Sequence, residues 1–202
     1  MDAQSTKPLL FVNVDGVLTS ARTYWKPSND GGRGARLDPV ALSILEQFCV
    51  EMDAEVVMAS AWSGMFCNSP AEWRNFFAEM GVKIPVVQML DLDGRSWADG
   101  MDDFMVMFSN RPHVLFEDDP AEAGRPFVVD VDAQVGLTTV DLEKAANMLA
   151  PGCKVAVELA RLNKAFSPEQ TITFSVNGAC VEAHPRDVGK ALTALGIPPA
   201  NN

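Results

Sequence analysis

Short apolar segments alternate with longer amphipathic segments along most of this chain. Four runs have the length and the apolar character of buried strands: Pro8–Val12, Glu55–Ala59, His113–Phe116 and Pro126–Val131. Helical patterns separate them, at about residues 38–52, 70–80, 97–108 and 139–149. Strands and helices that alternate in this way form a parallel sheet with right-handed crossovers. We therefore predict an α/β fold, with a mostly parallel sheet flanked by helices.

The pattern changes in the last quarter of the chain. A helical segment, Val155–Ala165, precedes two β-prone runs joined by Asn177-Gly178. Asn-Gly favours the tight turn of a β-hairpin, because both turn residues adopt positive φ. A final helix is expected at about residues 185–195. We predict a core of residues 1–150 and an extension of residues 151–202 that packs on the core or is appended to it.

Composition and charge restrict the function. The formal net charge of −11 argues against broad nucleic-acid binding, which needs a basic surface, although it leaves room for a phosphorylated small molecule or chain end. No apolar run reaches the roughly 18 residues of a membrane helix, so we expect no membrane association. The four cysteines are scattered and no secretory signal is evident. We therefore expect reduced thiols and a cytoplasmic protein.

Oxygen-bearing side chains follow three of the predicted strands. Asn13-Val14-Asp15-Gly16 follows the first strand, Ser60-Ala61-Trp62-Ser63 the second, and Glu117-Asp118-Asp119 the third. Each motif taken alone is also typical of turns and helix caps. Together they would lie at the carboxyl edge of a parallel sheet, where such folds bind ligands. Crowded carboxylates repel one another unless a cation joins them, and oxygen ligands suit Mg²⁺.

The order of these motifs resembles the haloacid dehalogenase-like (HAD) phosphatases. Residues 10–18 are similar to the first HAD motif, a strand followed by Asp-x-Asp-Gly, and residues 56–62 to the second. Residues 114–119 are similar to the fourth motif, an acidic pair after a strand. Gly136-Leu137-Thr138 resembles a sequence of the branch that includes the HAD domains associated with RNA repair. The resemblance covers roughly residues 8–149 and implies a Rossmann-like HAD core.

The resemblance also implies a Mg²⁺-dependent phosphatase mechanism through an aspartyl-phosphate. Asp15 would be the general acid and base, with its backbone carbonyl on the metal. The remaining implied roles are phosphate binding by Ser60 and Arg95, further substrate contacts from Gly16 and Ala61, and metal binding by Asn13, Asp15, Asp118 and Asp119. Arg95 takes the place of the third motif by its position alone, and a solvated surface arginine is the alternative interpretation.

Asn13 departs from the family pattern, because it occupies the position of the nucleophilic aspartate. An amide carries no charge and is a poor nucleophile, so this form is expected to be inactive or nearly so. It keeps a carbonyl oxygen for Mg²⁺. Asn13 is either an engineered change on an active phosphatase or a natural loss. In the second case the chain is a pseudoenzyme that binds a phosphorylated ligand or a protein partner.

Two further features bear on partners. The gaps from Gly16 to Val56 and from Ser60 to Arg95 leave no room for a large cap domain, which would leave the site open to a bulky substrate or a phosphorylated chain end. Residues 19–36 read as a loop with basic and aromatic side chains that could contact a nucleotide or a sugar phosphate. The C-terminal extension offers a different function, as a module that docks a partner or forms a homodimer.

Overall fold

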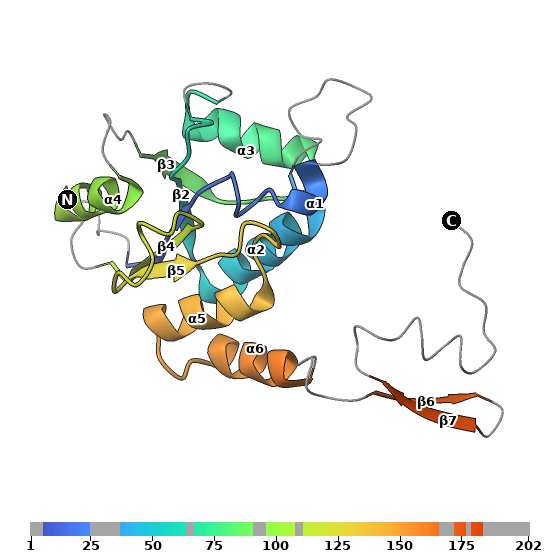
Figure 1. Cartoon of the computed structure of the whole chain (residues 1–202). Helices are drawn as coiled ribbons and strands as arrows, with labels where there is room; N and C mark the ends of the chain where they lie inside the picture. The colour runs from blue at the N-terminus through green and yellow to red at the C-terminus, as the bar shows by residue number, and fades with distance from the viewer. Residues whose placement is uncertain are drawn as a thin grey trace. The chain divides into compact units, whose positions relative to one another are not determined.

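The computed structural model describes residues 6–24, 37–63, 67–90, 96–107, 111–165, 172–176 and 179–183 (Figure 1). The chain divides into two compact units, Met1–Leu159 and Ala160–Asn202. The first unit contains all the strand-end motifs. The predicted division fell at residue 150, and in the structure residues 151–159 belong to the first unit, where Ala156 is buried in the core.

The first unit contains a five-stranded sheet in which every pairing is parallel. Its strands are β1 (Leu9–Val12), β2 (Glu55–Met58), β3 (Val86–Met89), β4 (His113–Glu117) and β5 (Val128–Asp130). Their order is β3-β2-β1-β4-β5, so β1 lies at the centre between β2 and β4. This arrangement confirms the predicted α/β, Rossmann-like fold. The described residues contain no separate cap domain.

Helices connect the strands of this sheet and follow its last strand. They are α1 (Ala21–Tyr24), α2 (Pro39–Met52), α3 (Pro70–Glu79), α4 (Trp97–Met107), α5 (Thr139–Leu149) and α6 (Lys154–Ala165). The side chain of Asp38 accepts a hydrogen bond from the Val40 N–H at the start of α2. Thr138 and Asp141 form a reciprocal capping box at the start of α5. Such caps satisfy the free N–H groups of the first helical turn, which explains why the predicted helices begin there.

Both faces of the sheet are buried, each against its own set of helices. Leu10 and Val12 of β1 belong to the larger core cluster, which includes side chains of α2, α3 and α5. Leu9 and Phe11, which alternate with them, belong to a second cluster with Met101 and Phe104 of α4. The period-two alternation of a strand thus divides β1 between two cores. In Figure 1, α4 lies on the opposite side of the sheet from α2 and α5.

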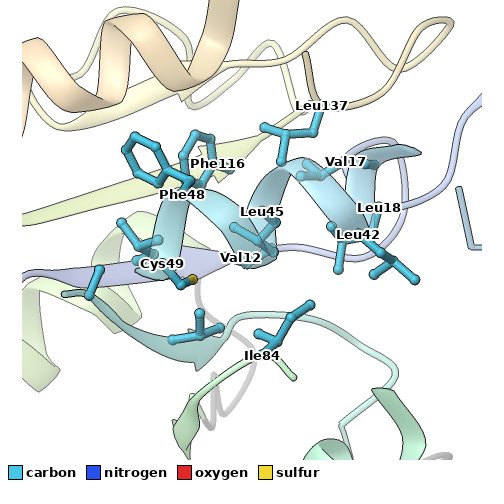
Figure 2. Packing of buried hydrophobic residues seen from close by; sticks show 14 of the residues in the cluster. Val12, Val17, Leu18, Leu42, Leu45, Phe48, Cys49, Ile84, Phe116 and Leu137 are labelled. Atoms are coloured by element: carbon cyan, nitrogen blue, oxygen red, sulfur yellow. The ribbon is translucent and has the colours of Figure 1, made fainter. Parts of the chain in front are cut away.

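Helix α2 anchors the larger core. Figure 2 shows its side chains Leu45, Phe48 and Cys49 close to Val12 of β1 and Phe116 of β4. These five residues are at most 3% exposed. The burial of these side chains fixes the positions of β1 and β4 close to their carboxyl ends.

The structure contains the predicted C-terminal hairpin. Residues 172–176 and 179–183 form the antiparallel strands β6 (Ile172–Val176) and β7 (Ala179–Ala183), which confirms the hairpin. Its turn residues and the expected last helix lie outside the described residues.

The loop predicted for residues 19–36 was wrong at its start, where α1 forms. The Ser20 N–H donates to Thr23 Oγ1, and the Thr23 hydroxyl donates to the Ser20 carbonyl. Residues 25–36 lie outside the described part of the chain.

A search of the helices in the described residues found none with the length and apolar character needed to cross a bilayer.

We predict that Leu45→Ala lowers the free energy of unfolding by about 2–5 kcal/mol, since it leaves a cavity under β1. Val50→Ala on the same helix is the matched control, because Val50 is 72% exposed. Its effect should stay within about 0.5 kcal/mol. Urea unfolding measures both, and equal losses in the two variants would contradict this assignment of the core.

Candidate functional site

The register of the sheet brings three strand ends to one edge. Val12 lies opposite Met58 of β2 and Phe116 of β4. The pairing continues past the strands, because the Asn13 N–H donates to the Phe116 carbonyl at 3.2 Å and the Ala59 N–H donates to the Val12 carbonyl at 2.9 Å. The strand order reverses direction beside β1, and parallel sheets bind ligands at such switch points.

Asn13 and Glu117 face each other across this edge. The Asn13 amide Nδ2 donates to Glu117 Oε1 at 2.9 Å, and Asn13 Oδ1 accepts from the Val14 N–H at 2.7 Å. Asn13 is 8% exposed and Glu117 is 2% exposed. Glu117 Oε1 also accepts from the backbone N–H groups of Asp118 and Asp119. Glu117 had been assigned no role from the sequence, although it stands in the acidic run that follows the third predicted strand.

The environment of Glu117 favours its neutral form. Burial raises the pKa of this carboxyl from 4.5 to about 7, and the hydrogen bond from Asn13 acts in the opposite direction. Its second oxygen, Oε2, is buried and has no hydrogen-bond partner among the described residues. A buried carboxylate oxygen without a partner carries an energetic cost that a proton or a cation can remove.

A tight turn places Asp15 and Gly16 over the end of β4. The Val14 carbonyl accepts hydrogen bonds from the N–H groups of residues 17, 18 and 19, and Gly16 has φ of +69°. A Cβ atom at Gly16 would lie 2.1 Å from Asp118 Oδ2. The half-buried Asp118 carboxylate therefore packs directly against the Gly16 backbone, in a space that a side chain would fill.

Trp62 joins Ser60 and Asp15 through two hydrogen bonds. The sequence motifs assign Trp62 no role. The Trp62 backbone N–H donates to Ser60 Oγ at 3.3 Å, and its indole Nε1–H donates to Asp15 Oδ2 at 3.1 Å. Ser60 is 1% exposed, and Trp62 is 7% exposed. The turn after β2 thus meets the turn after β1 through one aromatic side chain.

Two other predicted site residues, Ala61 and Asp119, are exposed. Ala61 is exposed in the turn after β2. Asp119 is exposed, and its Oδ1 accepts from the Ala121 N–H at 2.9 Å, which is an arrangement typical of a turn. Its role as a metal ligand stays a prediction. Arg95 lies outside the described residues, so its place relative to the site also stays a prediction.

The oxygen atoms at this edge fit a hard cation such as Mg²⁺. Within the described ranges, no group of three or more His, Cys, Asp or Glu side chains is close enough to form a metal site. The buried Glu117 Oε2, which has no partner among the described residues, belongs to the residue next to Asp118, whose carboxylate is a donor of the kind that Mg²⁺ prefers.

We predict that Gly16→Ala destabilises the protein more than Gly124→Ala does. Both glycines have positive φ, so each variant bears the cost of about 1–2 kcal/mol for a left-handed alanine. Only at Gly16 does the new Cβ meet another group, the Asp118 carboxylate, whereas nothing lies within 4 Å of it at Gly124. Equal shifts in thermal unfolding temperature would contradict the close approach of Asp118 to Gly16.

We also predict a specific pH dependence of stability in metal-free buffer. Between pH 4.5 and about 7 the folded protein keeps a proton on Glu117 that the unfolded chain has lost. The contribution of Glu117 to stability is therefore fully present below pH 4.5 and is lost as the pH rises through 7. Glu117→Gln removes this contribution while keeping an oxygen acceptor for Asn13. The difference in free energy of unfolding between the unchanged protein and Glu117→Gln should change between pH 4.5 and about 7 and stay constant outside this range. A difference that does not depend on pH would contradict the raised pKa of Glu117.

Comparison with known proteins gives the family. A search of curated proteins found no match to this chain. A family model, the HAD domain in Swiss Army Knife RNA repair proteins, matches residues 9–142. The match begins at β1, ends within α5, and includes the turns that carry Asn13, Ser60 and Asp118. It covers more than half of the chain and confirms the resemblance drawn from the sequence motifs. The chain belongs to the family of HAD domains found in Swiss Army Knife RNA repair proteins.

Proposed function

We propose that this chain is a HAD-type phosphatase domain that binds Mg²⁺ and a phosphoryl group at the carboxyl edge of its sheet, and in which Asn13 blocks the covalent step. The observation that carries the proposal is the meeting of Asn13, Asp15, Ser60 and the Glu117–Asp118 pair at one edge. These residues lie at or just after the ends of three strands, and all of them lie within the family match.

Mg²⁺ would be held by Asn13 Oδ1, the Asp15 backbone carbonyl and Asp118, with Asp119 in support. Bound there, it would supply positive charge to the oxygens of a phosphoryl group. The neutral form of Glu117 keeps the total negative charge of the site low when no cation is present. The site therefore combines oxygen donors with a limited repulsion toward an incoming phosphate.

We propose that Ser60 binds the phosphoryl group. Its Oγ already accepts a hydrogen bond from the Trp62 backbone N–H, so its own hydroxyl hydrogen can be donated to a phosphoryl oxygen. Arg95 is our candidate for a second, charged contact to the same group, which would hold it as charge develops on its oxygens. Gly16 and Ala61 would contribute backbone contacts, because neither side chain offers a polar atom.

Asn13 separates binding from catalysis. In the mechanism that the family implies, a carboxylate at this position attacks phosphorus, and Asp15 protonates the leaving group. The Asn13 amide cannot form an aspartyl-phosphate, and the loss of a covalent nucleophile lowers rates on the order of a million-fold in other hydrolases. Binding does not need the nucleophile, since the Asn13 carbonyl oxygen remains.

We propose a phosphorylated chain end as the ligand, specifically the terminal phosphate of an RNA. The family description refers to RNA repair, and the described residues contain no cap domain that would restrict access. The net charge of −11 limits contacts to the nucleic-acid backbone, so binding should depend on the terminal phosphate and on Mg²⁺. Free thiols at Cys49 and Cys153 fit a reducing compartment, and we propose the cytoplasm.

The test is Asn13→Asp, assayed with a general phosphomonoester and Mg²⁺. We predict that phosphatase activity appears with Asn13→Asp and is lost again when Asp15→Asn is added, because the restored nucleophile still needs its general acid. The unchanged protein and the Asp15→Asn single variant are the controls. Absence of activity from Asn13→Asp, with folding intact, would contradict the phosphatase proposal and favour a protein that only binds.

Stability offers a second readout of the same variant. Asn13→Asp places a carboxylate where an amide now donates to Glu117 at 2.9 Å, so two acidic groups would share one site. The variant should unfold at a lower temperature than the unchanged protein in EDTA. Mg²⁺ should raise the unfolding temperature of the variant by more than it raises that of the unchanged protein. An equal response of both proteins to Mg²⁺ would count against a metal at this position.

A further inference from the structure

We propose that Trp62 is a positioning residue that fixes the carboxyl group of Asp15 relative to Ser60. This inference rests on the proposed function, in which Asp15 is the acid and base and Ser60 binds phosphate. Trp62 makes hydrogen bonds to both: its backbone N–H to Ser60 Oγ at 3.3 Å, and its indole N–H to Asp15 Oδ2 at 3.1 Å. Nothing in the sequence motifs assigns it a role.

The surroundings of Trp62 hold its indole in place. The side chain is 7% exposed and belongs to the larger core cluster, so its ring is fixed by packing. The backbone of the turn is closed by a hydrogen bond from the Ser63 N–H to the Ser60 carbonyl at 2.9 Å. A rigid ring anchored in the core therefore presents its N–H at a defined point, and the Asp15 carboxyl group is oriented by it.

This geometry has a consequence for proton transfer. A general acid must point its carboxyl oxygen at the leaving group, and small misplacements of catalytic groups lower rates strongly. The indole N–H is a donor only and does not ionise in the working pH range, so it orients Asp15 without exchanging protons with it. An ordinary core tryptophan would contribute packing alone, and Trp73 is such a residue. It is fully buried on α3, and its indole N–H has no hydrogen-bond partner among the described residues.

The contact itself can be tested without any activity. The four tryptophans give four indole N–H signals in a ¹H–¹⁵N correlation spectrum of the unchanged protein, and Trp62→Phe and Trp73→Phe assign two of them. We expect Asp15→Asn to shift the Trp62 indole signal and to leave the Trp73 signal in place. A Trp62 signal that is unaffected by Asp15→Asn overturns the proposal.

The positioning role is tested by kinetics in the Asn13→Asp protein. Trp62→Phe keeps an aromatic ring and removes the N–H, and it should lower kcat by about tenfold or more with little change in KM, because the hydrogen bond that orients Asp15 is lost. Trp73→Phe should leave both constants unchanged. Thermal unfolding of each variant shows whether the fold is retained.

The outcomes separate this inference from the proposed function. An active Asn13→Asp protein in which Trp62→Phe leaves kcat unchanged, or alters KM alone, overturns the positioning role only. An equal loss of kcat from Trp73→Phe shows a general packing effect and also overturns it. An inactive Asn13→Asp protein removes the proposed function and the positioning role with it, even when the indole signals confirm the contact.

Discussion

The in-register pairing of β1 with both β2 and β4 is the constraint on which the site depends. Val12 lies opposite Met58 on one side and Phe116 on the other, so the residues that follow these strands must meet. A shift of one residue in the pairing of β1 with β4 would exchange the two faces of a strand and separate Asn13 from Glu117. The two buried cores secure this register, because adjacent residues of β1 belong to different clusters.

The meeting of the strand ends creates an electrostatic problem that the structure resolves in part. Glu117 is buried, and one of its oxygens has no hydrogen-bond partner in the described part of the chain, while the other accepts hydrogen bonds from Asn13 and from two backbone N–H groups. The amide of Asn13 matches this carboxylate as a donor, so a neutral residue at position 13 is chemically compatible with its neighbour. The Asn13 amide that donates to Glu117 occupies the position of the nucleophilic carboxylate in the family pattern. The residue that pairs with Glu117 therefore also explains the proposed lack of turnover.

Much of the fold followed from local patterns. Buried strands, capped helices and the C-terminal hairpin each have a signal within a few residues, such as the apolar run before Asn13 or the Asp38-Pro39 pair before α2. The contacts that define the site do not have such signals. Asn13 and Glu117 are 104 residues apart, and Trp62 and Asp15 are 47 apart. Their pairing depends on strand register and side-chain direction, which one sequence does not reveal. Asp118 beside Gly16 is a similar case, because only the folded turn shows why a side chain cannot fit.

We propose that one cation and one phosphoryl group bind together at this edge. A crystal structure of the unchanged protein, grown with Mg²⁺ and a phosphate mimic, would test this. We expect electron density for a cation in contact with Asn13 Oδ1 and Asp118, and for the mimic within hydrogen-bond distance of Ser60 Oγ. A cation and mimic bound elsewhere, with the side chains of residues 13, 15 and 118 turned away from one another, would contradict it.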